Sequence, residues 1–236
     1  MSINADCPVA VVTGASRGLG FGIAEHLVAK GYLVVGLSRN PPPLDSHFIH
    51  LPANLSDTES TISAFREIRH QFGRIDVLVN NAAFLNSQYL MIMPTNSIES
   101  MISTNLTGVV VATREALKMM RRNQFGRIIH VSSMATILKP PGDSVYAATK
   151  SAVETFSAVI AKEVFDLGIT SNVLSISAYD SDMLRSLNQE NVTKIIKSLP
   201  IARLVELPEV TDILDFLNSP AGSTVTGQVI RLGGVS

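Results

Sequence analysis

The chain has 236 residues and a formal net charge of −1. This length suffices for one α/β domain with a large core, and we expect a single domain over residues 1–236. Without a basic block, neither a nucleic acid nor a membrane surface is an expected partner. The lone Cys7 excludes an intrachain disulfide, and Met1–Pro8 lacks the apolar core of a secretory leader. We therefore expect a cytoplasmic protein.

Short apolar runs alternate with longer helical patterns along the chain. Several runs are apolar throughout, as expected for parallel strands that are covered on both faces. This alternation predicts a doubly wound α/β fold with a seven-stranded parallel sheet flanked by helices. The expected strands are Val9–Val12, Tyr32–Leu37, His47–Leu51, Ile75–Val79, Arg127–Val131, Ser171–Ile176 and Gln228–Leu232. The expected helices are Leu19–Ala29, Thr58–Phe72, Ile98–Arg122, Val145–Leu167 and Leu207–Leu217.

The connection between the second and third expected strands is unusually short. Arg39–Ser46 contains the consecutive prolines Pro41–Pro43, which cannot form the interior of a helix. We therefore expect a helix-free crossover there, and a plain loop at Ser219–Thr224. His47 and His50 form an H-x-x-H pattern, but residues three apart on a strand point to opposite faces, so we expect no metal site.

The first expected strand leads directly into Thr13–Gly20, which reads TGASRGLG, and then into a helix. Glycines permit a tight turn and let the backbone approach a pyrophosphate without an intervening Cβ. The helix N-terminus adds free N–H groups and a positive dipole end. This context favours a dinucleotide-binding turn over a glycine turn without a ligand. The expected contacts are Gly14, Ser16, Arg17, Gly18, Leu19 and Gly20.

The residues after the second strand bear on which nicotinamide cofactor binds. NAD sites usually carry a carboxylate there for the ribose 2′-hydroxyl, whereas this chain reads LSRN over Leu37–Asn40. Arg39, together with Arg17 in the glycine turn, can pair with a 2′-phosphate through charge-assisted hydrogen bonds. The alternative for both arginines is a solvated surface charge. We therefore expect NADPH to be favoured over NADH.

A second motif, YAATK over Tyr146–Lys150, lies near the start of an expected long helix. Residues at i and i+4 share a helix face. An ammonium group beside a phenol lowers the pKa of the phenol from about 10, which would suit Tyr146 to proton transfer near neutral pH. Upstream, the fifth strand ends near Ser133, at the rim where doubly wound sheets bind ligands. Ser133 can donate a hydrogen bond to the oxygen that Tyr146 protonates.

In order and spacing, these motifs resemble the short-chain dehydrogenase/reductase family, whose members have a Rossmann-type fold. The match spans the chain, from Thr13–Gly20 through Asn80–Ala83 to Thr226–Gly234. Within the family, the chain is most similar to 3-oxoacyl-thioester and carbonyl reductases. The resemblance implies that the catalytic residues are Asn105, Ser133, Tyr146 and Lys150.

The family's roles carry over to the matching residues. Tyr146 would be the general acid in reduction and the general base in oxidation. Lys150 would hold the nicotinamide ribose and lower the pKa of Tyr146, and Ser133 would polarise the carbonyl. Asn105 would hold a water in a proton relay from Lys150. Further cofactor contacts are implied at Asn54, where the family usually has Asp, and at Leu55, Asn81, Ala82 and Ser181.

The chain departs from the family after the sixth expected strand. The usual Pro-Gly pair is absent from Ile176–Met183, and the stretch is shorter than usual. Ser181 would stand in as the hydroxyl for the nicotinamide carboxamide. The change bears on substrate choice and on the strength of cofactor binding. Tyr179 is either a substrate contact or an ordinary packed tyrosine.

Together, the motifs predict NADPH-dependent reduction of a ketone, aldehyde or 3-oxoacyl thioester. Two alternatives stay open: an NAD(P)-dependent alcohol, sugar or cyclic-diol dehydrogenase, and a nucleotide-binding subunit with little catalysis, which the altered Ala178–Met183 motivates. By resemblance, Ile98–Arg122 and Val145–Leu167 would form the interface of a homodimer or homotetramer. A carrier-protein partner is unsupported, because Gln124 and Leu167 are uncharged where carrier-accepting relatives tend to have basic residues.

Overall fold

A computed structural model describes residues 7–234. The ends of the expected domain 1–236, including most of Met1–Pro8, lie outside the described residues. Seven parallel strands form one sheet in the order β3-β2-β1-β4-β5-β6-β7, which confirms the predicted α/β class. The strands are β1 (Val9–Thr13), β2 (Leu33–Ser38), β3 (Ile49–Pro52), β4 (Val77–Asn80), β5 (Gly126–Ser133), β6 (Ile169–Ile176) and β7 (Val229–Leu232).

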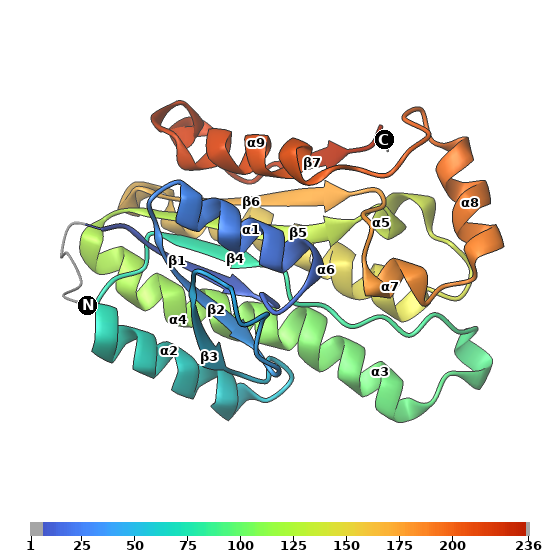
Figure 1. The fold of residues 1–236 in the computed structure, drawn as a ribbon, viewed down its shortest axis with the longest axis horizontal. Coiled ribbons are helices and arrows are strands. Elements are labelled where there is room, and N and C mark those ends of the chain that lie inside the picture. Colours follow the sequence, from blue (N-terminus) through green and yellow to red (C-terminus); the bar gives the residue numbers. More distant parts are fainter. Residues whose placement is uncertain (1–6, 235–236) are drawn as a thin grey trace.

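Helices cover both faces of the sheet (Figure 1). One face packs against α1 and α9, and the other packs against α2, α4 and α6. The five long helices are α1 (Gly18–Ala29), α2 (Thr58–Phe72), α4 (Gly108–Asn123), α6 (Ser144–Val164) and α9 (Leu207–Asn218). Shorter helices are α3 (Thr95–Ile102), α5 (Ala135–Leu138), α7 (Asp182–Arg185) and α8 (Gln189–Ser198).

Strand β1 shows why the apolar runs predict a sheet covered on both sides. Ala10 and Val12 belong to the core beneath α1 and α9, whereas Val11 belongs to the core beneath α2 and α4. All three side chains are fully buried. Because neighbouring side chains of a strand point to opposite faces, a strand with two buried faces must be apolar at every position.

The seven expected strands are all present, and their ends differ from the prediction by at most two residues. The crossover between β2 and β3 contains no helix, as predicted. His47 lies before β3 rather than on it, so the argument from opposite strand faces was wrong for this residue. Its ring contacts Glu25 of α1 at 2.7 Å, while the ring of His50 lies 3.2 Å from the Ser38 carbonyl oxygen.

The prediction of one continuous helix over Ile98–Arg122 is wrong. A π-helical turn over Ser103–Thr107 interrupts it between α3 and α4. The Ser103 hydroxyl donates to the Glu99 carbonyl at 2.7 Å, and such back-bonding competes with regular helical geometry. The turn also places Asn105 against a segment that follows β4.

Other segments also differ from the sequence prediction, which did not include the short helices α5 and α7 or a 3₁₀ turn over Leu90–Ile92. Helix α6 ends at Val164, and a 3₁₀ turn over Phe165–Leu167 follows it. The expected loop at Ser219–Thr224 contains a 3₁₀ turn over Pro220–Thr224. Helix α8 was not expected, and it contributes no fully buried residue to the core.

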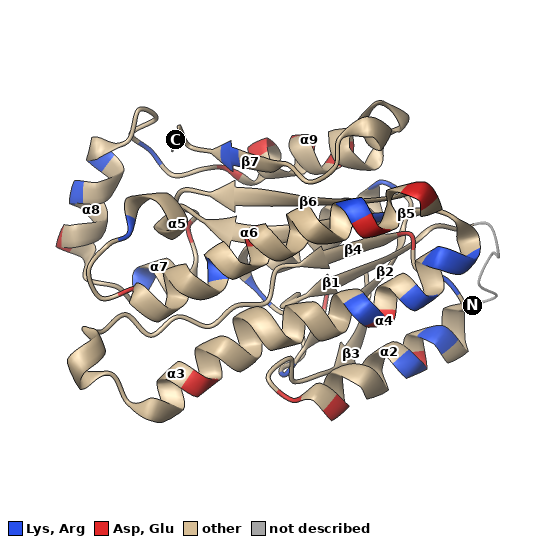
Figure 2. Cartoon of the chain, turned by 180° about the vertical axis from the view of Figure 1, so that it is seen from behind, with Lys and Arg blue, Asp and Glu red and all other residues tan. Residues whose placement is uncertain are grey.

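Charged residues are distributed over the surface helices (Figure 2). Arg121 and Arg122 lie exposed in the last turn of α4, where cations complement the helix dipole. Among the described residues, no helix is both long enough and apolar enough to cross a bilayer.

Candidate active site

The glycine turn joins the end of β1 to the start of α1. Gly14 and Gly18 have φ angles of 70° and 56°, in the region that favours glycine. A Cβ on Gly14 would lie 2.9 Å from the Ala82 backbone, and a Cβ on Gly20 would collide with the Gly14 carbonyl oxygen. The turn therefore depends on glycine for its conformation and for its close packing.

The N-terminus of α1 is suited to an anion. Arg17 occupies the N-cap position without a side-chain capping hydrogen bond, and the first turn contains no acidic residue. No side-chain acceptor of the first turn therefore competes with an anion for the free amides and the positive end of the helix dipole. This arrangement fits the pyrophosphate of a dinucleotide.

Thr13, the last residue of β1, and Asn81, which follows the neighbouring strand β4, hold the turn in place. The Thr13 hydroxyl accepts hydrogen bonds at 3.0 Å from the amides of both Asn81 and Ala82. The Asn81 side chain donates to the carbonyl oxygens of Thr13 at 3.1 Å and Gly14 at 3.3 Å. Asn81 and Ala82 thus lie beside the glycine turn, and their predicted contact with the cofactor stays a prediction.

The residues after β3 have local partners. The Asn54 side-chain oxygen accepts a hydrogen bond of 2.9 Å from the Ser56 hydroxyl. The Leu55 side chain is buried in the core beneath α2 and α4. A Cβ on Gly108, the first residue of α4, would collide with the Leu55 carbonyl oxygen. The predicted cofactor contacts at Asn54 and Leu55 stay predictions, and with its side chain in the core Leu55 could make such a contact only through its backbone.

The altered segment after β6 lies against the glycine turn. A Cβ on Gly18 would be 3.9 Å from the Ser181 Cβ. The Ser181 hydroxyl accepts from the Leu184 amide at 3.2 Å and so caps α7. Arg17 pairs with Asp182 at 3.2 Å, and both side chains are largely exposed. The structure therefore places Ser181 and Arg17 together, whereas Arg39 is exposed after β2.

Tyr179 corresponds to the packed alternative. Its side chain is partly buried and packs against the core beneath α1 and α9. The neighbouring Ala178 is buried, and its carbonyl oxygen accepts from the Val205 amide at 2.8 Å. The start of the altered segment is thus anchored to the core.

Ser133, Tyr146 and Lys150 meet at the carboxyl end of β5. Ser133 ends the strand, whereas Tyr146 and Lys150 lie one turn apart on α6. Tyr146 and Lys150 are 7% and 2% exposed. The Lys150 Nζ donates to the Val131 carbonyl oxygen at 2.7 Å and lies 5.8 Å from the centroid of the Tyr146 ring.

Burial dominates the protonation of these side chains. It raises the pKa of Tyr146 to about 12, and the hydrogen bond with Ser133 only partly opposes this effect. Burial also lowers the pKa of Lys150 to about 8, against the opposing charge of Glu154. The pKa of Tyr146 is therefore raised in this structure rather than lowered as expected, because desolvation of the phenolate outweighs the hydrogen bond with Ser133.

Asn105 links three segments around the site. Its side chain accepts from the Phe84 amide at 2.7 Å and donates to the Phe84 carbonyl at 2.9 Å. It also donates to the Thr149 hydroxyl at 3.2 Å, and Thr149 bonds the Tyr146 carbonyl oxygen. π-helical turns of this kind often occur at functional sites. The predicted water relay through Asn105 stays a prediction.

Sequence reasoning missed a buried polar network that joins His130 of β5 to residues of β4 and β6. His130 is fully buried, and burial lowers its pKa to about 3, so its ring is neutral. The ring lies 3.2 Å from the Asn80 side-chain nitrogen and 3.3 Å from the Ser171 hydroxyl. Sequence reasoning also missed Glu154, although its spacing of four residues from Lys150 places both on one face of the helix.

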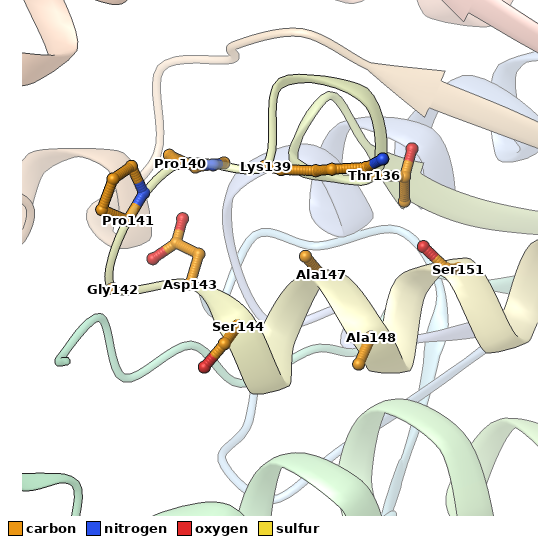
Figure 3. A pocket seen from close by; sticks show the side chains of 10 residues that line it. All are labelled: Thr136, Lys139, Pro140, Pro141, Gly142, Asp143, Ser144, Ala147, Ala148 and Ser151. Atoms are coloured by element: carbon orange, nitrogen blue, oxygen red, sulfur yellow. The ribbon is translucent and has the colours of Figure 1, made fainter. Parts of the chain in front are cut away.

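A hollow of about 380 Å³ lies beside the first turns of α6 and the loop that joins α5 to α6 (Figure 3). The Asp143 carboxylate projects into the space between α6 and the loop that contains Lys139. One Asp143 oxygen is buried without a hydrogen-bond partner among the described residues, and burial raises the pKa of this carboxyl. The lining residues are Thr136, Lys139, Pro140, Pro141, Gly142, Asp143, Ser144, Ala147, Ala148 and Ser151.

Comparisons with known proteins assign the chain to a family. A sequence model of the short chain dehydrogenase family matches residues 8–192. The chain belongs to this family. It is 35% identical over 233 residues to the 3-oxoacyl-[acyl-carrier-protein] reductase of Salmonella typhimurium, covering 96% of each chain. It is 34% identical over 239 residues to the Escherichia coli reductase of the same name, covering 98% of each.

A solved structure extends the family assignment to the fold. The ligand-free aldohexose dehydrogenase of Thermoplasma acidophilum superposes with a TM-score of 0.90 at 26% identity, covering 98% of this chain and 94% of that one. As a member of the short chain dehydrogenase family, the protein is an NAD(P)-dependent oxidoreductase that acts on CH–OH or C=O groups.

Proposed function

We propose that the protein uses NADPH to reduce a ketone, an aldehyde or a 3-oxoacyl thioester to an alcohol. The observation that carries this proposal is the convergence of Ser133, Tyr146 and Lys150 at the sheet edge that also holds the glycine turn. The two reductases of Salmonella typhimurium and Escherichia coli support the carbonyl substrate class.

The protonation of the site favours reduction. Bound NADPH would supply the hydride. Ser133 donates a hydrogen bond to the carbonyl oxygen, and Tyr146 transfers its proton to that oxygen as negative charge develops there. Because the pKa of Tyr146 is about 12, the phenol is protonated at neutral pH, which is the form that a general acid requires. Charged Lys150 then stabilises the phenolate that remains.

The preference for NADPH rests on Arg17 and Arg39. Both side chains are exposed, so neither carries a burial cost that would oppose binding of a phosphate. Arg17 is paired with Asp182, but an exposed ion pair is worth only about 0–1 kcal/mol. A bidentate guanidinium–phosphate pair is stronger than a monodentate exposed contact. A 2′-phosphate can therefore compete with Asp182 for Arg17.

A second candidate function is oxidation of an alcohol or sugar. The similarity to the aldohexose dehydrogenase favours it, because that fold match covers nearly the whole chain. Oxidation requires Tyr146 as a phenolate, so the rate in this direction should increase as the pH rises.

We also propose a homo-oligomer in which α4 and α6 form the interface, because α6 exposes apolar side chains such as Val159.

The test is a panel of ketones, aldehydes, diketones, 3-oxoacyl thioesters and sugars assayed in both directions with all four nicotinamide cofactors. We expect absorbance loss of NADPH with at least one carbonyl, at a higher kcat/KM than with NADH. Faster oxidation of a sugar at pH 7 would select the second candidate. If the protein binds a dinucleotide tightly but turns over no substrate, the result would instead support a nucleotide-binding subunit with little catalysis.

A further inference from the structure

Glu154 extends the line of Tyr146 and Lys150 along α6. The three residues follow one another at intervals of four, so they share one helix face. The Glu154 carboxylate accepts a hydrogen bond of 2.7 Å from the Ser132 hydroxyl. Ser132 is nearly fully buried at the end of β5, directly before Ser133. The carboxylate is therefore held close to the candidate site without being part of it.

Lys150 and Glu154 are tied to consecutive residues of β5. The Lys150 ammonium donates to the Val131 carbonyl oxygen at 2.7 Å, and Glu154 receives the hydrogen bond of the next residue, Ser132. Two successive turns of α6 are thus anchored to the last residues of the strand. Because Tyr146 lies on the preceding turn, these anchors fix its placement relative to Ser133.

Glu154 also compensates the buried charge of Lys150. Burial favours the neutral amine and lowers the pKa of Lys150, whereas Glu154 acts in the opposite direction. His130 faces Lys150 from β5 but is neutral, because burial lowers its pKa to about 3. Tyr146 is a neutral phenol at neutral pH. Among these neighbours, Glu154 supplies the negative charge that offsets the ammonium.

Other elements packed against α6 offer no substitute. Strand β6, helix α5 and the π-helical turn over Ser103–Thr107 consist of uncharged residues. Strand β5 contributes a cation, Arg127, and the 3₁₀ turn after α6 contains Asp166, which is exposed to solvent. Helix α3 contains one carboxylate, Glu99, which is exposed to solvent. Asp143 precedes α6 and acts on Tyr146, where it raises the pKa of the phenol.

We propose that Glu154 is a positioning residue that keeps Lys150 charged and in register behind Tyr146. The inference rests on the proposed function for its catalytic consequence, since a charged Lys150 is what stabilises the Tyr146 phenolate. The effect of Glu154 on the charge of Lys150 is a property of the folded chain and can be measured without turnover.

The test compares three variants with the unmodified protein. Glu154→Gln removes the charge but keeps an oxygen that accepts the Ser132 hydroxyl. Glu154→Asp keeps the charge. Glu163→Gln removes an equal charge from an exposed position on the same helix. Thermal unfolding and NADPH binding establish that each variant is folded.

The first readout is the titration of Lys150, followed by NMR on protein labelled with [ε-13C]lysine, with the Lys150 signal assigned by its loss in Lys150→Arg. In Glu154→Gln, we expect the midpoint to fall by about 0.5–1 pH unit, because a nearby opposite charge favours the ammonium. In Glu163→Gln and Glu154→Asp, it should stay near the wild-type midpoint. Coincident Glu154→Gln and wild-type titrations would overturn the inference.

The second readout is the pH profile of NADPH-dependent reduction. Activity requires charged Lys150, so it falls as the pH rises through the pKa of Lys150, which is about 8. Glu154→Gln should move this alkaline limb to lower pH by the same amount, about 0.5–1 unit, because the ammonium loses its interaction with a nearby carboxylate. A shifted titration in a protein without reductase activity would support the assignment of Glu154 while rejecting the proposed function. If the wild type is active and the alkaline limb of Glu154→Gln does not shift, Glu154 does not support catalysis through Lys150.

Discussion

Burial sets the protonation of the side chains on which the proposed chemistry depends. Tyr146 and Lys150 are almost completely removed from water, and each is pushed toward its neutral form. For Tyr146 the neutral form is the acid that reduction needs. For Lys150, the proposed chemistry needs the charged ammonium, so the nearby carboxylate of Glu154 opposes the effect of burial. The same physical effect therefore acts in opposite senses on two neighbouring residues.

The two arginines proposed to bind the 2′-phosphate of NADPH allow a further prediction. Arg17→Ala and Arg39→Ala should each raise the KM for NADPH about 10–100-fold, the loss expected for hydrogen bonds to a charged group. The KM for NADH should change little, because NADH lacks the 2′-phosphate. Steady-state kinetics with both cofactors measure the effect, and Arg66→Ala on α2 is the exposed control. Equal losses for NADPH and NADH would contradict the assignment.

At the scale of elements, Asn105 couples the site to the irregular backbone that surrounds it. Three hydrogen bonds join the π-helical turn to Phe84 and to Thr149 of α6. Two of these bonds satisfy backbone groups of Phe84. Removing one partner of a buried hydrogen bond leaves the other unsatisfied, which is the costly case.

Asn105→Ala should therefore destabilise the fold by about 1–3 kcal/mol and lower kcat, because α6 carries both Tyr146 and Lys150. The matched control is Asn86→Ala, whose side chain makes one hydrogen bond of 2.8 Å, to Ser97. We expect a loss below about 1 kcal/mol for the control. Urea denaturation and steady-state kinetics measure both variants. Indistinguishable losses would argue against a linking role for Asn105.

The elements also show what sequence reasoning can reach. The glycine turn and the spacing of Tyr146 and Lys150 are local patterns, so both were predictable from the chain alone. The raised pKa of Tyr146 was not, because desolvation depends on segments distant in sequence. The break between α3 and α4 escaped prediction for a related reason, since Asn105 bonds to Phe84, which follows a different strand. The buried side chain of Leu55 likewise depends on α4 packing against it.

At the scale of the whole molecule, the outer faces of the long helices bear on assembly. Val159 of α6 is 49% exposed, and Phe165 just beyond the helix is 48% exposed. These exposed apolar side chains near the end of α6 support the proposed contact between copies of the chain.

Sedimentation velocity at micromolar concentration should therefore give the mass of a dimer or a tetramer. Val159→Glu should shift the population toward the monomer, because a charge in an apolar interface is costly to desolvate. Leu44→Glu changes a fully exposed residue of the crossover loop and should leave the mass unaltered. A monomeric wild-type protein would contradict the proposed oligomer.

Single-turnover hydride transfer in Tyr146→Phe tests whether Tyr146 is the general acid. We predict that this variant binds NADPH as tightly as the wild type but transfers hydride to the best carbonyl about 10²–10⁴-fold more slowly, the usual contribution of a positioned general acid. Tyr32→Phe, at a partly buried tyrosine remote from the site, should retain the wild-type rate. A Tyr146→Phe protein that transfers hydride at the wild-type rate would contradict the account.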